Sequence, residues 1–226
     1  MTGPLQLSVF DIDGTLVDSQ REIVAAMRAA FASHALRAPD PAQILSIVGL
    51  SLPQAIAQLA PDLSEAVQTR LVHGYKHHFA QDRARSAPPP LYPGAHALLD
   101  ALAEQPEMLL GIATGKSRRG LMALLTAHDL GPRFVTTQVA DDHPSKPHPA
   151  MLAAALSETG VPAAMGVMIG DTSFDIEMAR AAGLCSIGVA WGYHGAQRLT
   201  AAGADVVVPD MDALCGELLS RKRVTS

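Results

Sequence analysis

From Pro93 to the end of the chain, short apolar runs alternate with segments of helical periodicity. Of all the features of the sequence, this alternation most restricts the folds that the chain can adopt. Gly131, Gly160 and Gly183 each follow a predicted helix, where glycine commonly ends one. Alternating strands and helices form parallel strands joined by helical crossovers. We therefore predict an α/β fold, a Rossmann-like parallel sheet with helices on both faces. The predicted strands are residues 5–10, 108–113, 134–139, 167–169, 185–190 and 205–208.

The segment between the first predicted strand and the proline run Pro88–Pro90 differs in character. It contains no convincing strand, and the sequence Ser19-Gln20-Arg21-Glu22 has the form of a capping box that begins its first helix. The proline run then stiffens the exit from the segment. We expect residues 18–87 to form an α-helical cap subdomain inserted into a core domain of residues 1–17 and 88–226. Helical patterns cover residues 23–31, 42–48, 52–59 and 64–79.

The composition excludes several classes of protein. The 226 residues are 48% hydrophobic and 17% charged, enough for a sizeable core, and the net charge of −5 lacks the basic excess of nucleic-acid binding. No apolar run approaches the ~20 residues that span a bilayer, and Met1–Pro4 lacks the positive region of a secretory signal. Cys185 and Cys215 are expected to be reduced thiols. We expect a cytoplasmic monomer or homodimer without nucleic-acid or membrane partners.

Two acidic residues lie where the first predicted strand ends, in the stretch Phe10-Asp11-Ile12-Asp13-Gly14-Thr15. Gly14 allows a sharp turn there. Two carboxylates at this spacing can share a divalent cation, or divide the roles of nucleophile and acid–base catalyst. Taken alone, the stretch is equally compatible with an acidic turn that has no function.

Further polar groups follow other predicted strands: Thr114-Gly115, Lys146, and the pair Asp171 and Asp175. Since ligands of parallel sheets bind at the carboxyl ends of the strands, we expect these groups to converge. Crowded carboxylates need a cation between them, and an all-oxygen site suits Mg²⁺. A hydroxyl, a glycine amide and a lysine can hold phosphate oxygens. The sequence therefore predicts a site for a phosphoryl group and its Mg²⁺.

Each cluster also has an alternative interpretation. Asp171 can simply cap a helix, Lys146 can be an ordinary loop lysine, and Thr114-Gly115-Lys116 shares a fragment of a nucleotide-binding loop without its full pattern. The prediction of a phosphoryl site would fail only if all of these alternatives were true at once.

The four clusters resemble, in order and spacing, the four motifs of the haloacid dehalogenase (HAD) superfamily of hydrolases over nearly the full chain. The most similar members are phosphoglycolate phosphatase-like enzymes with a small α-helical cap. The matching residues are Asp11-Ile12-Asp13-Gly14-Thr15, Thr114, Lys146, and Gly170-Asp171 with Asp175.

The resemblance implies a role for each residue. Asp11 would attack phosphorus and form an aspartyl-phosphate, while Asp13 would protonate the leaving alcohol and then activate water. Mg²⁺ would be held by Asp11, Asp171 and the backbone carbonyl of Asp13, with Asp175 either near the metal or orienting Lys146. Thr114, Gly115 and Lys146 would bind the phosphoryl oxygens.

The resemblance further implies a Mg²⁺-dependent phosphatase that acts on a small phosphorylated metabolite. A pyrophosphatase and a β-phosphoglucomutase-like phosphotransferase are the alternatives, and the complete motif set disfavours a non-catalytic phosphate-binding module. The presence of Asp13 argues against dehalogenation. Substrate choice is expected to lie in the cap, where Gly49-Leu50-Ser51 resembles a loop that approaches the site. Candidate substrate contacts, for which plain solvated surface is the favoured alternative, are His73, Lys76, His77, Arg118 and Arg119.

Overall fold

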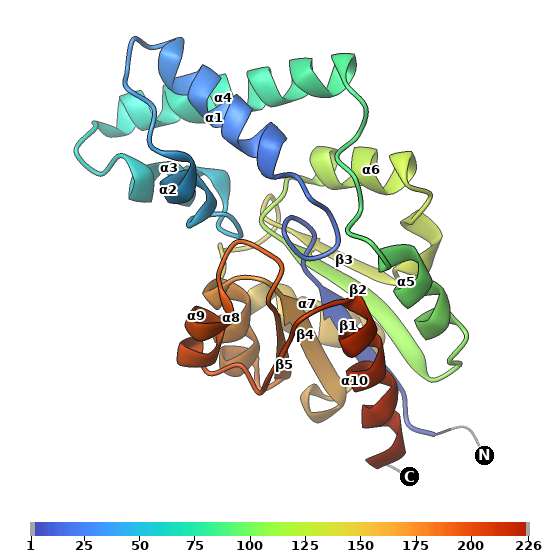
Figure 1. Ribbon diagram of the computed structural model, residues 1–226. Helices are drawn as coiled ribbons and strands as arrows, with labels where there is room; N and C mark the ends of the chain where they lie inside the picture. Colours follow the sequence, from blue (N-terminus) through green and yellow to red (C-terminus); the bar gives the residue numbers. More distant parts are fainter. Residues whose placement is uncertain (1–2, 225–226) are drawn as a thin grey trace.

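A single parallel sheet forms the centre of the molecule in the computed structural model, which describes residues 3–224 (Figure 1). Its strand order is β3-β2-β1-β4-β5-β6, which confirms the predicted α/β class. The chain runs from β1 outward through β2 and β3, then returns to the other side of β1, so the strand order reverses there. Such a switch point is where parallel sheets bind ligands. The strands are β1 (Gln6–Phe10), β2 (Met108–Thr114), β3 (Thr136–Val139), β4 (Gly166–Gly170), β5 (Cys185–Val189) and β6 (Val206–Val208).

Helices cover both faces of the sheet, because the strands bury apolar side chains on alternate sides. Phe10 packs into a cluster with helices α5 (Ala95–Ala103), α6 (Arg118–Ala127) and α10 (Met211–Val224). Leu7 and Val9 face the opposite cluster, with α7 (Ala150–Thr159) and α8 (Ser173–Ala182). Helix α9 (Ala196–Ala202) contacts α8, β5 and β6. Short 3₁₀ turns η1 (Gly131–Arg133) and η2 (Ala163–Met165) complete this part.

The boundaries of several elements differ from the sequence prediction. Helix α5 begins at Ala95, after Gly94 at a φ of 87°, and α6, the helix predicted to end next to Gly131, already ends at Ala127. Strand β3 begins two residues later than predicted, at Thr136, because η1 occupies the preceding turn. Among the helices of residues 3–224, none combines the length and apolar character needed to cross a bilayer.

Four helices lie between β1 and β2 in the chain and stand over the carboxyl edge of the sheet, at the top of Figure 1. They share an apolar cluster that includes Met27, Phe31, Ile56 and Leu71, as expected for a unit with its own small core. The division into residues 18–87 and the remainder stays a prediction. The helices are α1 (Gln20–Ala32), α2 (Pro41–Leu45), α3 (Leu52–Leu59) and α4 (Glu65–Arg85). The second ends earlier, and the fourth runs further, than predicted.

The capping box predicted at the start of α1 does not form. Ser19 occupies the N-cap position, but its side chain makes no capping hydrogen bond. Its hydroxyl instead donates to Asp13 Oδ1 at 2.5 Å. A hydrogen bond to a carboxylate is stronger than one to a backbone amide, so the tertiary contact prevails over the local one.

Candidate active site

Three polar residues stand together at the carboxyl ends of the central strands. The register pairs Phe10 of β1 with Ile112 of β2 and with Ile169 of β4. Asp11 therefore follows β1 beside Thr114 at the end of β2, and beside Asp171 just after β4. All three are buried. The predicted convergence of Asp11, Thr114 and Asp171 is thus present in the structure.

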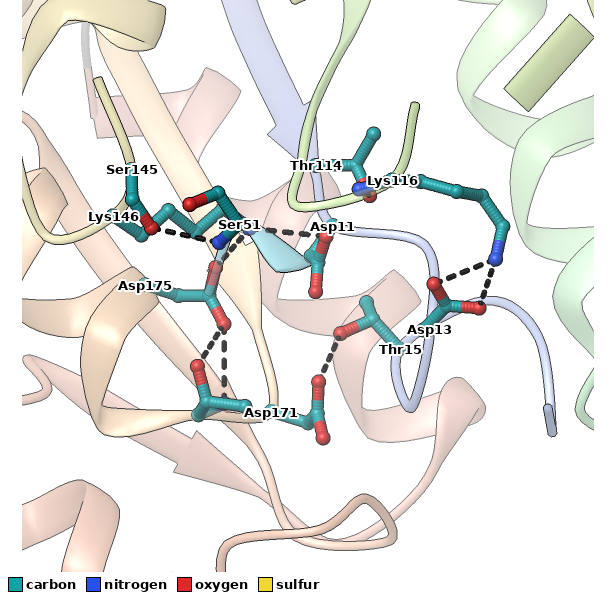
Figure 2. Close-up of polar contacts among 11 residues, drawn as sticks. Asp11, Asp13, Thr15, Ser51, Thr114, Lys116, Ser145, Lys146, Asp171 and Asp175 are labelled. Atoms are coloured by element: carbon teal, nitrogen blue, oxygen red, sulfur yellow. Dashed lines mark hydrogen bonds and ion pairs between the residues drawn. The ribbon is translucent and has the colours of Figure 1, made fainter. Parts of the chain in front are cut away.

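Lys146 reaches this point from the loop between β3 and α7, and Asp175 from the first turn of α8 (Figure 2). Lys146 Nζ donates to Asp175 Oδ1 at 2.6 Å and lies 3.0 Å from Asp11 Oδ1. Burial alone would lower the pKa of Lys146, but the charges of Asp11 and Asp175 outweigh it and raise that pKa. The lysine is therefore held as a cation between two carboxylates.

Asp11, Asp171 and Asp175 form a three-carboxylate cluster, in which one oxygen of each lies within 4.8 Å of the others. Burial raises the pKa of Asp11 to about 7 against the field of Lys146, and the charges of Asp175 and Asp13 add to the rise. Burial also raises the pKa of Asp171 well above its usual range, and Asp11 and Asp175 raise it further. More negative charge is gathered here than Lys146 compensates, so the cluster favours a bound cation.

The three carboxylates of the cluster differ in the hydrogen bonds that their oxygens accept. Asp11 Oδ1 pairs with Lys146 Nζ at 3.0 Å, and beyond this ion pair neither oxygen of Asp11 has a hydrogen-bond partner among the described residues. Asp171 accepts one bond at each oxygen, from Thr15 Oγ1 at 3.1 Å and from the Tyr193 amide at 2.8 Å. Each oxygen therefore retains an unused lone pair.

Asp175 is more fully engaged. Its Oδ1 faces Lys146, and its Oδ2 accepts from both the amide and the hydroxyl of Thr172 in a capping box of α8. The arrangement fits a divalent cation such as Mg²⁺, with Asp11 and Asp171 as carboxylate ligands and Asp175 orienting Lys146. The alternative that Asp171 caps α8 is wrong, because Thr172 holds that position.

Gly14 allows the loop after β1 to approach this cluster. Its φ is +88°, which favours glycine, and a Cβ atom at this position would stand 2.2 Å from Asp171 Oδ2. Steric constraints thus explain why the first motif has a glycine at position 14.

The carboxylate of Asp13 lies outside the three-carboxylate cluster and has a partner that sequence reasoning missed. Lys116 Nζ lies 2.8 Å from its Oδ1 and 2.7 Å from its Oδ2, and both side chains are nearly buried (Figure 2). Lys116 follows directly after the predicted Thr114-Gly115 pair. Its relevance is invisible in the sequence because Asp13 and Lys116 lie 103 positions apart.

The predicted cap loop, Gly49-Leu50-Ser51, does close over the site. A Cβ atom on Gly115 would lie 2.6 Å from the carbonyl oxygens of both Gly49 and Leu50, so only glycine allows this approach. The Ser51 amide donates to Ser145 Oγ at 2.7 Å, next to Lys146. The cap and the core therefore meet directly at the phosphate-binding residues that the sequence predicts.

His194 makes a second link between cap and core. Its Nδ1 accepts from the Ser173 amide at 3.0 Å, so its Nε2 carries the proton and donates to the Ser46 carbonyl at 2.9 Å. Burial lowers the pKa of this imidazole, which keeps the ring neutral. The segment 191–195 carried no sequence signal, because its role is fixed only by contacts across the fold.

A cavity of about 610 Å³ lies between the cap and the carboxyl edge of the sheet. Asp11, Asp13, Thr114 and Gly115 line its core side. Of the candidate substrate contacts, Lys76 and Arg119 line the cavity, whereas His73, His77 and Arg118 are not among its lining residues. Arg118 instead bonds Thr137 and Asp142, and His73 and His77 are exposed.

Comparison with known proteins shows the family to which this chain belongs. The family model described as haloacid dehalogenase-like hydrolase matches residues 8–189. A protein named probable phosphatase IndB, from Dickeya dadantii, is 37% identical over 93% of this chain and 92% of its own length. The phosphoglycolate phosphatase of Cupriavidus necator is 32% identical, again over 93% and 92%. A crystal structure of a hydrolase from Pseudomonas syringae superimposes with a TM-score of 0.84 at 25% identity, covering 95% of this chain and 98% of that one.

The chain belongs to the haloacid dehalogenase-like hydrolase family and is a phosphatase of that family. The resemblance inferred from the four motifs is therefore confirmed.

Proposed function

We propose that this protein hydrolyses a small phosphomonoester of the phosphoglycolate type, with Mg²⁺ as cofactor and Asp11 as nucleophile. The single observation that carries the proposal is the state of Asp11. This carboxylate is buried at the floor of the cavity, and neither of its oxygens is engaged by a hydrogen bond from a described residue. A carboxylate whose contact among the described residues is the ion pair with Lys146 keeps lone pairs for both a cation and an electrophile.

In the first step, an oxygen of Asp11 attacks phosphorus, the bond from phosphorus to the ester oxygen breaks, and Asp13 gives that oxygen a proton. The products are an aspartyl-phosphate and the free alcohol. In the second step, Asp13 takes a proton from water, which attacks the same phosphorus. The bond to Asp11 then breaks, and phosphate leaves.

The surrounding residues hold the phosphoryl group and its charge. In this proposal the Thr114 hydroxyl, the Gly115 amide and Lys146 Nζ bind phosphoryl oxygens, and the hydrogen bond from Lys146 to Asp175 supports the role of the lysine. Mg²⁺, when held by Asp11, Asp171 and the Asp13 carbonyl, supplies positive charge that offsets the negative charge of the phosphoryl group.

The decisive test is hydrolysis of p-nitrophenyl phosphate with Mg²⁺ and with a chelator. We expect metal-dependent turnover for the wild type and a loss of about a thousandfold or more for Asp11→Asn. Asp142→Asn is the matched control, since this exposed carboxylate pairs with Arg118 outside the cluster. Wild-type protein with no metal-dependent turnover on any phosphate ester would refute the proposal.

A wider panel separates the proposal from its alternatives. If pyrophosphate were the only compound of the panel from which phosphate is released, the protein would be a pyrophosphatase. Isomerisation of a sugar phosphate would indicate a phosphotransferase. We also propose a cytoplasmic location, in line with the free thiols of Cys185 and Cys215.

A further inference from the structure

Lys116 stands beside the group that, on the proposed function, meets the leaving oxygen. Its ammonium lies 2.7 and 2.8 Å from the two oxygens of Asp13. Lys116 therefore lies beside Asp13 (Figure 2), within reach of a substituent on the carbon next to the ester oxygen when Asp13 contacts that oxygen.

The ammonium of Lys116 also has binding capacity left. A lysine has three N–H donors, and the two contacts with Asp13 use no more than two of them. The Phe79 ring from α4 lies on another side, with its centroid 5.3 Å from Nζ. Among the described residues, Asp13 alone makes a polar contact with this ammonium, and Lys116 lines the cavity. The remaining donor can therefore serve a bound molecule.

We propose that Lys116 determines specificity by binding the carboxylate of a 2-phosphorylated 2-hydroxy acid, in which the carboxylate is borne by the carbon next to the ester oxygen. This inference rests on the proposed function, which supplies the placement of Asp13 at the leaving oxygen. In such a substrate the carboxyl carbon is two bonds from that oxygen, within reach of an ammonium that already touches Asp13. The ion pair forms in a nearly buried place, where it is screened little by solvent.

The size of the cavity allows substrates of this class that are larger than its simplest member, 2-phosphoglycolate. Its volume of about 610 Å³ is at the scale of pockets for larger metabolites. On the cap side, apolar and aromatic side chains including Met27, Val48, Tyr75 and Phe79 line the cavity next to the cations Lys76 and Arg83, and the rings of Tyr75 and Phe79 are stacked at 5.6 Å. A methyl or larger apolar group on the same carbon has a surface to pack against. Esters such as 2-phospholactate therefore fall within the class.

The test compares 2-phosphoglycolate with its neutral amide, which has the same skeleton without the negative charge. We expect the wild type to prefer the carboxylate by about 10- to 100-fold in kcat/KM, as for loss of a charged hydrogen bond. Lys116→Met should reduce that preference to about threefold or less. 2-Phospholactate should behave as 2-phosphoglycolate does.

Several controls separate this inference from a structural role. Turnover of p-nitrophenyl phosphate by Lys116→Met reports folding and phosphoryl transfer, and the inhibition constant of inorganic phosphate reports the phosphoryl site; both should change less than the carboxylate preference. Arg133→Met removes a cation from the pair with Asp100, neither of which lines the cavity, and should leave the preference unchanged. The preference of the wild type is itself a measurement that needs no variant.

Two results would overturn the inference while the proposed function stands. One is a wild type that hydrolyses p-nitrophenyl phosphate through Asp11 but treats acid and amide alike. The other is a Lys116→Met variant that loses activity on both esters equally, which would make Lys116 only a support for Asp13. A wild type inactive on every ester would overturn the proposed function, and the inference with it.

Discussion

Lys146 and Asp175 form an ion pair in which both side chains are fully buried, with Nζ 2.6 Å from Oδ1. The same ammonium lies 3.0 Å from Asp11. Lys146 is thus the counter-ion of the three buried carboxylates of the cluster. If it is removed, their negative charge is shielded neither by solvent nor by contact with another cation of the described residues.

Lys146→Met should lower the free energy of unfolding of the metal-free protein by about 3–5 kcal/mol, because breaking a buried pair strands its partner. Urea unfolding at alkaline pH with a chelator measures this. Arg133→Met breaks the more exposed pair with Asp100 and should cost about 1 kcal/mol or less. Equal losses for the two variants would contradict the assignment of Lys146 as the counter-ion of the cluster.

The stability of the metal-free protein should fall as pH rises from about 4 to about 7. The pKa of Asp11 is raised to about 7, and the pKa of Asp171 is raised well above its usual range. In this interval the folded state keeps protons that the unfolded chain has released, so raising the pH favours unfolding. Urea midpoints measured across the interval, with a chelator present, test this.

Two comparisons isolate the cluster from the other titrating groups. The double variant Asp11→Asn, Asp171→Asn should show a flatter pH dependence than the wild type. Added Mg²⁺ should stabilise the wild type most at the alkaline end, since it binds ionised carboxylates. A wild type and double variant with identical pH profiles would show that these two carboxyls do not titrate as described.

The sequence was sufficient for those parts of the site that depend on strand ends. Asp11, Thr114 and Asp171 follow apolar runs, and parallel pairing alone brings such ends to one edge of the sheet. Lys146 was expected at the same edge because it follows the predicted strand 134–139, but it lies within a proline-containing loop, so the family resemblance gave it additional support.

The parts that sequence reasoning missed depend on contacts between distant segments. The sequence indicates Lys116 only as part of a fragment of a nucleotide-binding loop, yet its side chain extends to Asp13. Ser19 matched a local capping pattern, but the Asp13 carboxylate takes its hydroxyl. Local sequence patterns reflect interactions within one segment. The positions of the Lys116 and Ser19 side chains are instead set by Asp13, a partner outside the local pattern.

Gly115→Ala should disturb the closure of the cap loop while leaving the fold intact. A Cβ there would stand 2.6 Å from the carbonyls of Gly49 and Leu50, so the loop must move. We expect kcat/KM for p-nitrophenyl phosphate to fall by about tenfold or more, with a change in unfolding free energy of about 1 kcal/mol. Gly131→Ala is the matched control, because a Cβ there meets nothing within 4 Å. Full activity of Gly115→Ala would show that the loop approach is not needed for turnover.

His194→Asn should loosen the cap without removing the support of α8. An asparagine can still accept from the Ser173 amide in place of Nδ1, but it is too short to reach the Ser46 carbonyl as Nε2 does. We expect amide hydrogen exchange in residues 44–53 to accelerate by about tenfold, the equivalent of one lost hydrogen bond, and KM to rise with little change in global stability. His143→Asn, at a histidine that bonds Gln138 away from the cap, controls for the substitution itself. If exchange in residues 44–53 were the same in His194→Asn and in the wild type, the cap would be held by the loop contacts at Gly115 and Ser145 alone.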